Sequence, residues 1–182
     1  MRIAVLLVVA AFTISSSCMA EWIERSGEKL PDTAFRKSEG AFSSWLVLVP
    51  DDRALYTDWQ KPGASVQVSE TDQVRVNEPI SAFVVFSDCM ADTLGNCDVQ
   101  MRFRVLAPDG SVYAESPSME VWQGKKAPNA QLLELSVGYL KVAIEPHEQL
   151  GNYQVEAQVK DLISGKVLLL QKPFRAASGA ET

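Results

Sequence analysis

The fold is decided by two stretches of sequence, VQMRFRV at residues 99–105 and YQVEAQVK at residues 153–160. In both stretches, apolar residues alternate with polar or charged ones. A period of two places the apolar side chains on one face of a β-strand and leaves the others in water. A helix would scatter the same residues around its circumference. Both stretches therefore predict half-buried strands.

Two further stretches, WLVLV at residues 45–49 and ISAFVVF at residues 80–86, are apolar on both faces. Such strands lie at the centre of a sheet, or another element covers their outer face. Turn sequences stand at residues 108–110 (PDG) and 164–165 (SG), and Gly or Pro recurs about every eight or nine residues along the chain. This punctuation predicts an all-β sandwich or barrel.

The rest of the chain divides by composition. Residues 21–44, rich in Gly, Ser, Lys and Glu, predict an irregular N-terminal arm, with any helix short and placed after Asp32, around residues 33–37. Residues 45–176 carry the strand pattern and are expected to form one sandwich domain. Residues 177–182 are left as a C-terminal tail.

Residues 1–20 have the parts of a secretory signal peptide: Arg2, an apolar run at residues 3–14, and small residues up to Ala20. Cleavage after Ala20 would make the protein periplasmic or secreted. The alternative is a lipoprotein signal with Cys18 as the acylated residue, which Ser15 disfavours because an aliphatic residue usually stands there. No later apolar stretch approaches 18 residues, so no transmembrane segment is expected.

Export changes what the remaining cysteines mean. In an oxidising compartment the isolated pair Cys89 and Cys97 predicts a structural disulfide. A redox-active or metal-binding pair is the alternative, but the spacing is not C-x-x-C and no His or third Cys lies nearby.

The C-terminal stretch LGNYQV at residues 150–155, followed by Asp161 and SGK at residues 164–166, resembles the last hairpin of bacterial immunoglobulin-like domains. The resemblance covers about residues 98–174 and implies an immunoglobulin-like antiparallel β-sandwich of a secreted protein. It also implies that Tyr153 forms a tyrosine corner, in which the hydroxyl bonds to the upstream backbone. Cys89 and Cys97 are too close in sequence for the disulfide that joins the two sheets of antibody domains. They are expected instead to clamp one loop.

The sequence gives no positive sign of an enzyme. The one histidine, His147, precedes a turn, and no G-x-S-x-G string occurs. No metal or cofactor is predicted, although the acidic residues of the 88–98 loop leave calcium as an alternative, and these are Asp88, Asp92, Asn96 and Asp98. The formal charge of −6 disfavours nucleic-acid binding, since Lys125 and Lys126 form only a small basic cluster.

Aromatic residues among polar neighbours are the remaining candidates for contact. Tyr56, Trp59 and Trp122 are expected to expose part of their rings, which can anchor a protein interface or stack on sugars. The predicted function is a non-enzymatic, exported binding protein of the bacterial cell envelope that contacts a protein partner through sheet edges or loops. The alternatives are a carbohydrate-binding module that uses Trp59 or Trp122, an acidic inhibitor or immunity-type protein, and an enzyme with an atypical site.

Overall fold

A computed structural model describes residues 22–23, 29–61, 67–130 and 132–178. The predicted signal peptide, its cleavage site and Cys18 lie outside these residues. The elements in chain order are β1 (Trp22–Ile23), β2 (Lys29–Leu30), β3 (Arg36–Glu39), β4 (Phe42–Val49), α1 (Asp52–Trp59), β5 (Gln73–Arg75), β6 (Pro79–Ser87), β7 (Asn96–Leu106), β8 (Val112–Glu115), β9 (Met119–Lys126), β10 (Glu134–Leu135), β11 (Leu140–Ala143), β12 (Gly151–Asp161) and β13 (Val167–Ala177). No helix among the described residues is long and apolar enough to cross a membrane.

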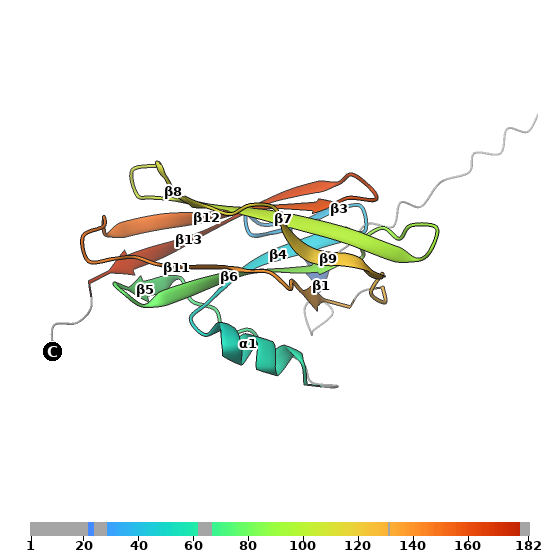
Figure 1. Cartoon of the computed structure of the whole chain (residues 1–182), viewed down its shortest axis with the longest axis horizontal. Coiled ribbons are helices and arrows are strands. Elements are labelled where there is room, and N and C mark those ends of the chain that lie inside the picture. Colours follow the sequence, from blue (N-terminus) through green and yellow to red (C-terminus); the bar gives the residue numbers. More distant parts are fainter. Residues whose placement is uncertain (1–21, 24–28, 62–66, 131, 179–182) are drawn as a thin grey trace, which may run out of the picture.

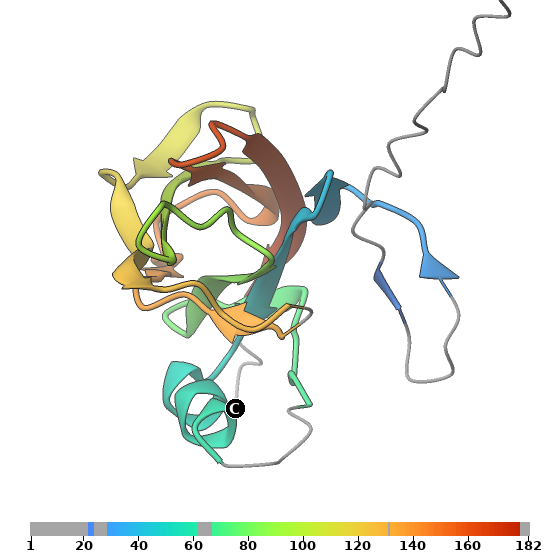
Figure 2. The same ribbon diagram turned by 90° about the vertical axis from the view of Figure 1, so that its right-hand side faces the viewer.

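Two β-sheets pack face to face as a sandwich, seen from the side in Figure 1 and end-on in Figure 2. The five-stranded sheet has the strand order β10-β6-β4-β3, with β11 also paired to β6. The six-stranded sheet has the order β5-β13-β12-β7-β8, with β9 also paired to β7. The predicted all-β sandwich is confirmed. A separate two-stranded sheet pairs β1 with β2. Among the strand pairs of the sandwich that the structure describes, one departs from the antiparallel pattern, because β5 runs parallel to β13.

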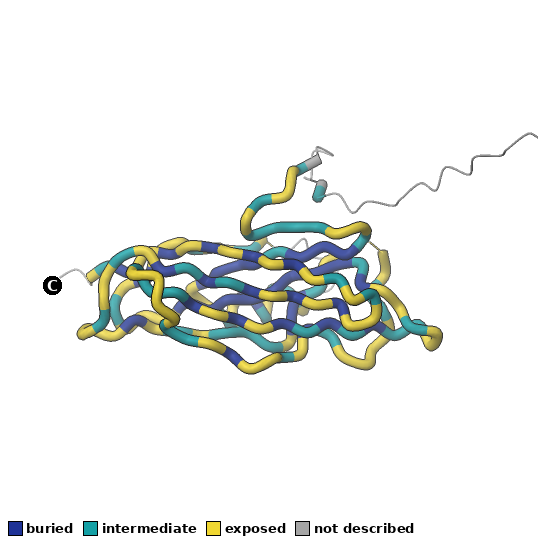
Figure 3. Tube along the Cα trace, turned by 90° about the horizontal axis from the view of Figure 1, so that it is seen from above, coloured by how far each residue is buried: buried dark blue, intermediate teal, exposed yellow. Residues whose placement is uncertain are grey.

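The inner core fills the space between the two sheets with the apolar half of each alternating strand. Buried and exposed residues alternate along β7, β12 and β13, as the colours in Figure 3 show. The largest inner-core side chains with less than 2% exposure include Phe42, Phe86, Phe103 and Tyr153. The period-two pattern read from residues 99–105 and 153–160 is thus confirmed.

Helix α1 lies on the outer face of the five-stranded sheet, on the side away from the six-stranded sheet (Figures 1 and 2). Its Leu55 is buried against a second apolar group, which we call the helix-side cluster: Val47, Val49, Leu55, Phe83, Val85 and Leu135. Four of these residues supply the outward-facing apolar positions of β4 and β6: Val47, Val49, Phe83 and Val85. The expectation that a further element covers one face of those strands is therefore correct.

The structure differs from the sequence expectation in residues 33–44. No helix forms at residues 33–37; instead Arg36 pairs with Trp45 in the ladder between β3 and β4. The five-stranded sheet thus begins within the stretch expected to be an irregular arm, because Phe42 is buried in the inner core. The helix forms at α1, where the Asp51 side chain accepts a hydrogen bond from the Ala54 amide and caps its first turn.

Two local predictions match the structure. Cys89 and Cys97 form a disulfide that closes the loop between β6 and β7. The Tyr153 hydroxyl donates a hydrogen bond of 2.7 Å to the backbone carbonyl of Gln149, four residues upstream. This is the contact that the resemblance to a tyrosine corner implies.

Strand β13 is bonded on both sides along much of its length. It pairs with β12 from Val167 to Ala176, and its other edge pairs with β5. On that second edge the backbone amide of Gln171 also donates to the backbone carbonyl of Ala34, at 2.7 Å. The last strand of the chain is thus an interior strand that also meets the segment leading into β3.

Candidate functional site

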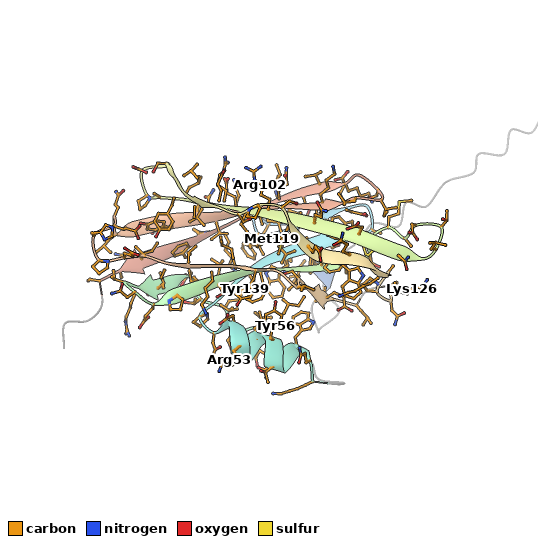
Figure 4. The ribbon with its side chains drawn as sticks, viewed as in Figure 1. Arg53, Tyr56, Arg102, Met119, Lys126 and Tyr139 are labelled. Carbon is orange, nitrogen blue, oxygen red and sulfur yellow. A yellow bond between two sulfur atoms is a disulfide. The ribbon has the colours of Figure 1, made fainter. Side chains whose placement is uncertain are left out.

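A groove of about 370 Å³ crosses the outer face of the six-stranded sheet, on the side of the molecule opposite α1. Its walls are two neighbouring rows of outward-facing side chains from β7, β12 and β13. The strand register makes Arg104, Glu156 and Gln171 the first row. The second row consists of Arg102, Gln158 and Leu169, and Figure 4 shows Arg102 projecting from the face away from the helix.

The first row is bonded together through Glu156. The Arg104 guanidinium donates from Nε and Nη2 to Glu156 Oε2, at 2.8 and 2.6 Å. The side-chain amides of Gln171 and Gln154 donate to the other oxygen, Oε1, at 3.0 and 3.2 Å. One carboxylate thus receives donors from three side chains, and the row forms a fixed polar wall with no net charge.

Electrostatics keep this wall in its charged form. Burial raises the pKa of Glu156, but the hydrogen bonds and positive charge of Arg104 outweigh burial and hold that pKa below its ordinary value. The bond to Glu156 raises the pKa of Arg104 in turn. A carboxylate with a lowered pKa, both of whose oxygens already accept hydrogen bonds, is a poor general acid or base at neutral pH. Glu156 therefore acts as an organising acceptor.

The second row still has donors to offer. The side-chain amide of Gln158 has no hydrogen-bond partner among the described residues. The Arg102 guanidinium makes one long contact of 3.4 Å to the Glu115 carboxylate. Arg102 is 54% exposed and Leu169 is 56% exposed. The row therefore sets a guanidinium with one carboxylate contact, a side-chain amide without a partner and an apolar side chain in a line across three strands. Such a line can hold an anionic group at one end and an apolar group at the other.

The sequence singled out other residues, and the structure does not bring them together. Tyr56 and Trp59 lie on α1, where both pack against the helix-side cluster. The Tyr56 ring meets Phe83 edge-on at 5.3 Å, and its hydroxyl donates to the Val137 carbonyl at 2.5 Å. Tyr139 stacks on Phe83 at 4.6 Å and meets the Tyr56 ring edge-on at 5.9 Å, and Figure 4 shows the two tyrosines between helix and sheet. These contacts fasten α1 to the sheet.

Trp122 lies on β9, apart from Tyr56 and Trp59. Its ring packs on Phe86 of the inner core at 5.8 Å, and its indole nitrogen donates to the Lys126 carbonyl at 3.1 Å. The Lys125 ammonium lies over the ring, 5.1 Å from its centroid. Trp122 thus covers the edge of the core and leaves part of its ring at the surface.

The remaining candidates have local partners. His147 is 77% exposed and lies 3.5 Å from the Glu145 carboxylate. In the 88–98 loop, Asp92 Oδ1 accepts from the amides of Leu94 and Asn96, so this oxygen closes the turn. Within the described residues, no three His, Cys, Asp or Glu side chains gather as metal ligands would.

The sequence shows which polar residues line the groove on β7 and β12, but it does not show that they lie side by side. The two stretches that decide the fold contain these polar residues: Arg102, Arg104, Glu156 and Gln158. Their alternation predicts only a sheet face that is open to water. What was missing is the register. Arg104 meets Glu156 across 52 residues of sequence, and β13 has to add Leu169 and Gln171 beside them.

No protein-family model matches the chain, and no curated protein matches it in sequence. Among solved structures, a family 123 glycoside hydrolase from Clostridium perfringens, studied for glycolipid glycan hydrolysis, is 8% identical with a TM-score of 0.41 over 75% of this chain. An alkylpurine DNA glycosylase from Pseudomonas fluorescens, bound to DNA with an abasic site analogue, is 11% identical with a TM-score of 0.35 over 59% of this chain. The chain spans 28% of the length of each.

Both similar structures are enzymes, and this finding corrects the predicted function. The prediction of a non-enzymatic envelope protein that contacts a protein partner through sheet edges or loops is withdrawn. Its alternatives, the tryptophan-based carbohydrate module and the acidic inhibitor, are withdrawn with it. At these TM-scores neither enzyme's activity transfers to this chain. The function has to follow from the side chains of the chain itself.

Proposed function

We propose that the groove binds a small carboxylate with an apolar tail. The supporting observation is the second row, in which the exposed Arg102 guanidinium, with its one long contact to Glu115, and the exposed Leu169 lie on opposite sides of Gln158. A guanidinium pairs with a planar carboxylate through two parallel hydrogen bonds, and Leu169 offers apolar surface to the tail.

The spacing of the strands limits the length of the ligand. Arg102 and Leu169 are two strand spacings apart, which is roughly 10 Å across a sheet. A straight carboxylate of about eight carbons covers that span in an extended form. Gln158 lies beneath its middle, and the first row closes one side of the groove.

Calorimetric titration of the purified protein with octanoate, acetate and octanamide tests the proposal. We expect octanoate to bind with a Kd on the order of 1 mM, since the site is open to water. Acetate lacks the tail and octanamide lacks the charge, so both should bind at least about tenfold more weakly. Octanamide binding as tightly as octanoate would contradict the role of Arg102.

Matched variants locate the site. Arg102→Gln and Leu169→Gln should each weaken octanoate binding, the first by about tenfold, because a charge-assisted bond is lost. Arg175→Gln is the control, since Arg175 lies on the same face of β13 but outside the groove. Equal weakening by Arg102→Gln and Arg175→Gln would mean that general charge, and not the groove, attracts the ligand.

Export is proposed as the second part of the function. The disulfide between Cys89 and Cys97 supports folding in an oxidising compartment, and the Tyr153 contact supports the likeness to exported immunoglobulin-like domains. Intact mass of protein recovered from its own compartment tests this. A mature chain that begins at Glu21 is expected, and a lipid-modified Cys18 or a retained residue 1 would contradict it.

A further inference from the structure

One end of the sandwich carries a group of exposed apolar side chains, which we call the apolar end. Three loops supply them, those between β6 and β7, between β9 and β10, and between β12 and β13, and Figure 1 shows these loops turning at its right-hand side. The members, with exposures from 37% to 72%, are Met90, Leu94, Leu132, Leu133, Leu162 and Ile163.

Carboxylates within the loops satisfy the backbone of these apolar residues. Asp161 is fully buried, and its two oxygens accept from the amides of Met90, at 2.9 Å, and Ile163, at 3.0 Å. Asp92 accepts from the amide of Leu94 at 2.8 Å. The side chains of these three apolar residues point outward while their amides are bonded inside the protein.

Backbone carbonyls and a lysine complete the pattern. The Leu162 amide donates to the Asp98 carbonyl at 2.8 Å, and the Leu132 amide donates to the Asn129 carbonyl at 3.1 Å. The Leu94 carbonyl accepts from the Lys126 ammonium. In water a loop needs none of these internal partners, whereas in an apolar medium each unbonded amide costs several kcal/mol. The amides of Met90, Leu94, Leu132, Leu162 and Ile163 therefore need no water partner.

Four lysines lie behind the apolar tips, beside the half-buried carboxylates of Asp88, Asp98 and Glu134. Lys125 and Lys126 follow Trp122 at the end of β9, and Lys160 and Lys166 flank the hairpin between β12 and β13. The carboxylates of Asp92 and Asp161 are turned inward to backbone amides, so they offset this charge less at the surface. Lysine and tryptophan beside an apolar tip are typical of segments that lie at a membrane interface.

From these observations we infer that the apolar end inserts into the interface of a lipid bilayer that contains anionic lipids. The six side chains enter the boundary between headgroups and acyl chains, and the lysines lie at headgroup level. A second copy of the chain or another protein fits less well. A protein interface carries about one hydrogen bond per 100–200 Å², and the loop amides are already bonded.

Co-sedimentation with vesicles tests this inference. Full-length protein is mixed with vesicles of phosphatidylcholine and phosphatidylglycerol at about 3:1, or of phosphatidylcholine alone. Leu94→Gln/Ile163→Gln removes two tips, and Val112→Gln/Leu150→Gln is the matched control at the opposite end, where these side chains are 52% and 46% exposed. We expect the tip variant to bind the mixed vesicles at least about tenfold less than the wild type, and the control to bind as the wild type does.

Local readouts separate insertion from other attachment. Residues 88–96 and 162–166 should exchange their amide hydrogens more slowly when mixed vesicles are present, and the thermal melting temperatures of both variants confirm folding. Equal vesicle binding by wild type and tip variant, or unchanged exchange in both loops, overturns the inference. A wild type that dimerises without lipid, while the tip variant stays monomeric and neither binds vesicles, would assign the apolar end to a second copy of the chain.

Discussion

Glu156 shows how one side chain can organise an open sheet face. It stands in the middle strand of the groove and receives Arg104 from one neighbouring strand and Gln171 from the other. The carboxylate therefore fixes side chains that would otherwise sample several rotamers. The groove depends on this residue for its shape, even though the proposed ligand contacts the other row.

Replacing this carboxylate should reveal its pH dependence. Because the pKa of Glu156 is lowered in the folded protein, its contribution to stability is present above the ordinary glutamate pKa of about 4.3 and is lost as the pH falls through the folded value. We expect Glu156→Gln to be less stable than the wild type at pH 7, and the gap to close near pH 3. Urea denaturation at both pH values measures it.

Glu39→Gln provides the control, because Glu39 is exposed at the end of β3 and its side chain has no hydrogen bond or ion pair with the described residues. Its stability should follow that of the wild type at both pH values. A gap between wild type and Glu156→Gln that stays the same at pH 3 would show that the amide disturbs packing and not charge.

Single residues differ in how far the sequence reveals them. Tyr153 was predicted with its partner, because the hydroxyl bonds only four residues upstream and the surrounding motif is local. The pairing of Arg104 with Glu156 was not, because it depends on which residues of β7 and β12 face each other. A shift of one residue in that register would turn one of the two side chains into the core and separate the pair.

At the scale of elements, α1 is the part that the sequence analysis missed. Its signal was present, since Asp51 precedes the helix as a cap and Leu55 and Trp59 lie four residues apart on one face. The stretch is too short to be stable alone, because an isolated helix of this length does not form in water. The exposed apolar face of β4 and β6 supplies what the helix lacks.

Removal of the cap should loosen the helix by a known amount. Asp51→Ala deletes the acceptor for the Ala54 amide and should lower the free energy of unfolding by about 1 kcal/mol. Asp51→Asn keeps an acceptor and should retain most of the stability. Urea denaturation of the three proteins measures the difference, and an Asn variant as unstable as the Ala variant would argue against capping as the cause.

At the scale of the whole molecule, the disulfide links the start of β7 to the loop that follows β6. Cys89→Ala/Cys97→Ala should lower the free energy of unfolding by about 2.5 kcal/mol, because the unfolded chain regains the freedom of a closed loop of roughly nine residues. Both sulfur atoms are buried, so the variants also lose some packing.

Reduction of the wild type by dithiothreitol separates these two effects, because it opens the loop and keeps both side chains. We expect most of the loss to appear on reduction alone, measured by thermal melting with and without the reductant. A reduced protein as stable as the oxidised one would contradict a stabilising role for the cross-link.

The sandwich as a whole was predictable because apolar and polar residues alternate within each of the strands β7, β12 and β13. The partners of the strands were not. β5 pairs in parallel with β13, about a hundred residues further along the chain. The sequence of neither segment indicates that the other is its partner. The division of the outer sheet faces into a groove, a helix-covered apolar side and a water-exposed side follows from those pairings.

The place of β13 in the fold has a consequence for biosynthesis. When the ribosome has made the first 160 residues, the six-stranded sheet still lacks the strand that joins β12 to β5, and Phe174 has not reached the core. The nascent polypeptide therefore cannot complete its sandwich before residues 167–177 have left the ribosome. A chain that completes its fold this late stays unfolded for longer, and an unfolded chain can pass through a narrow protein-conducting channel.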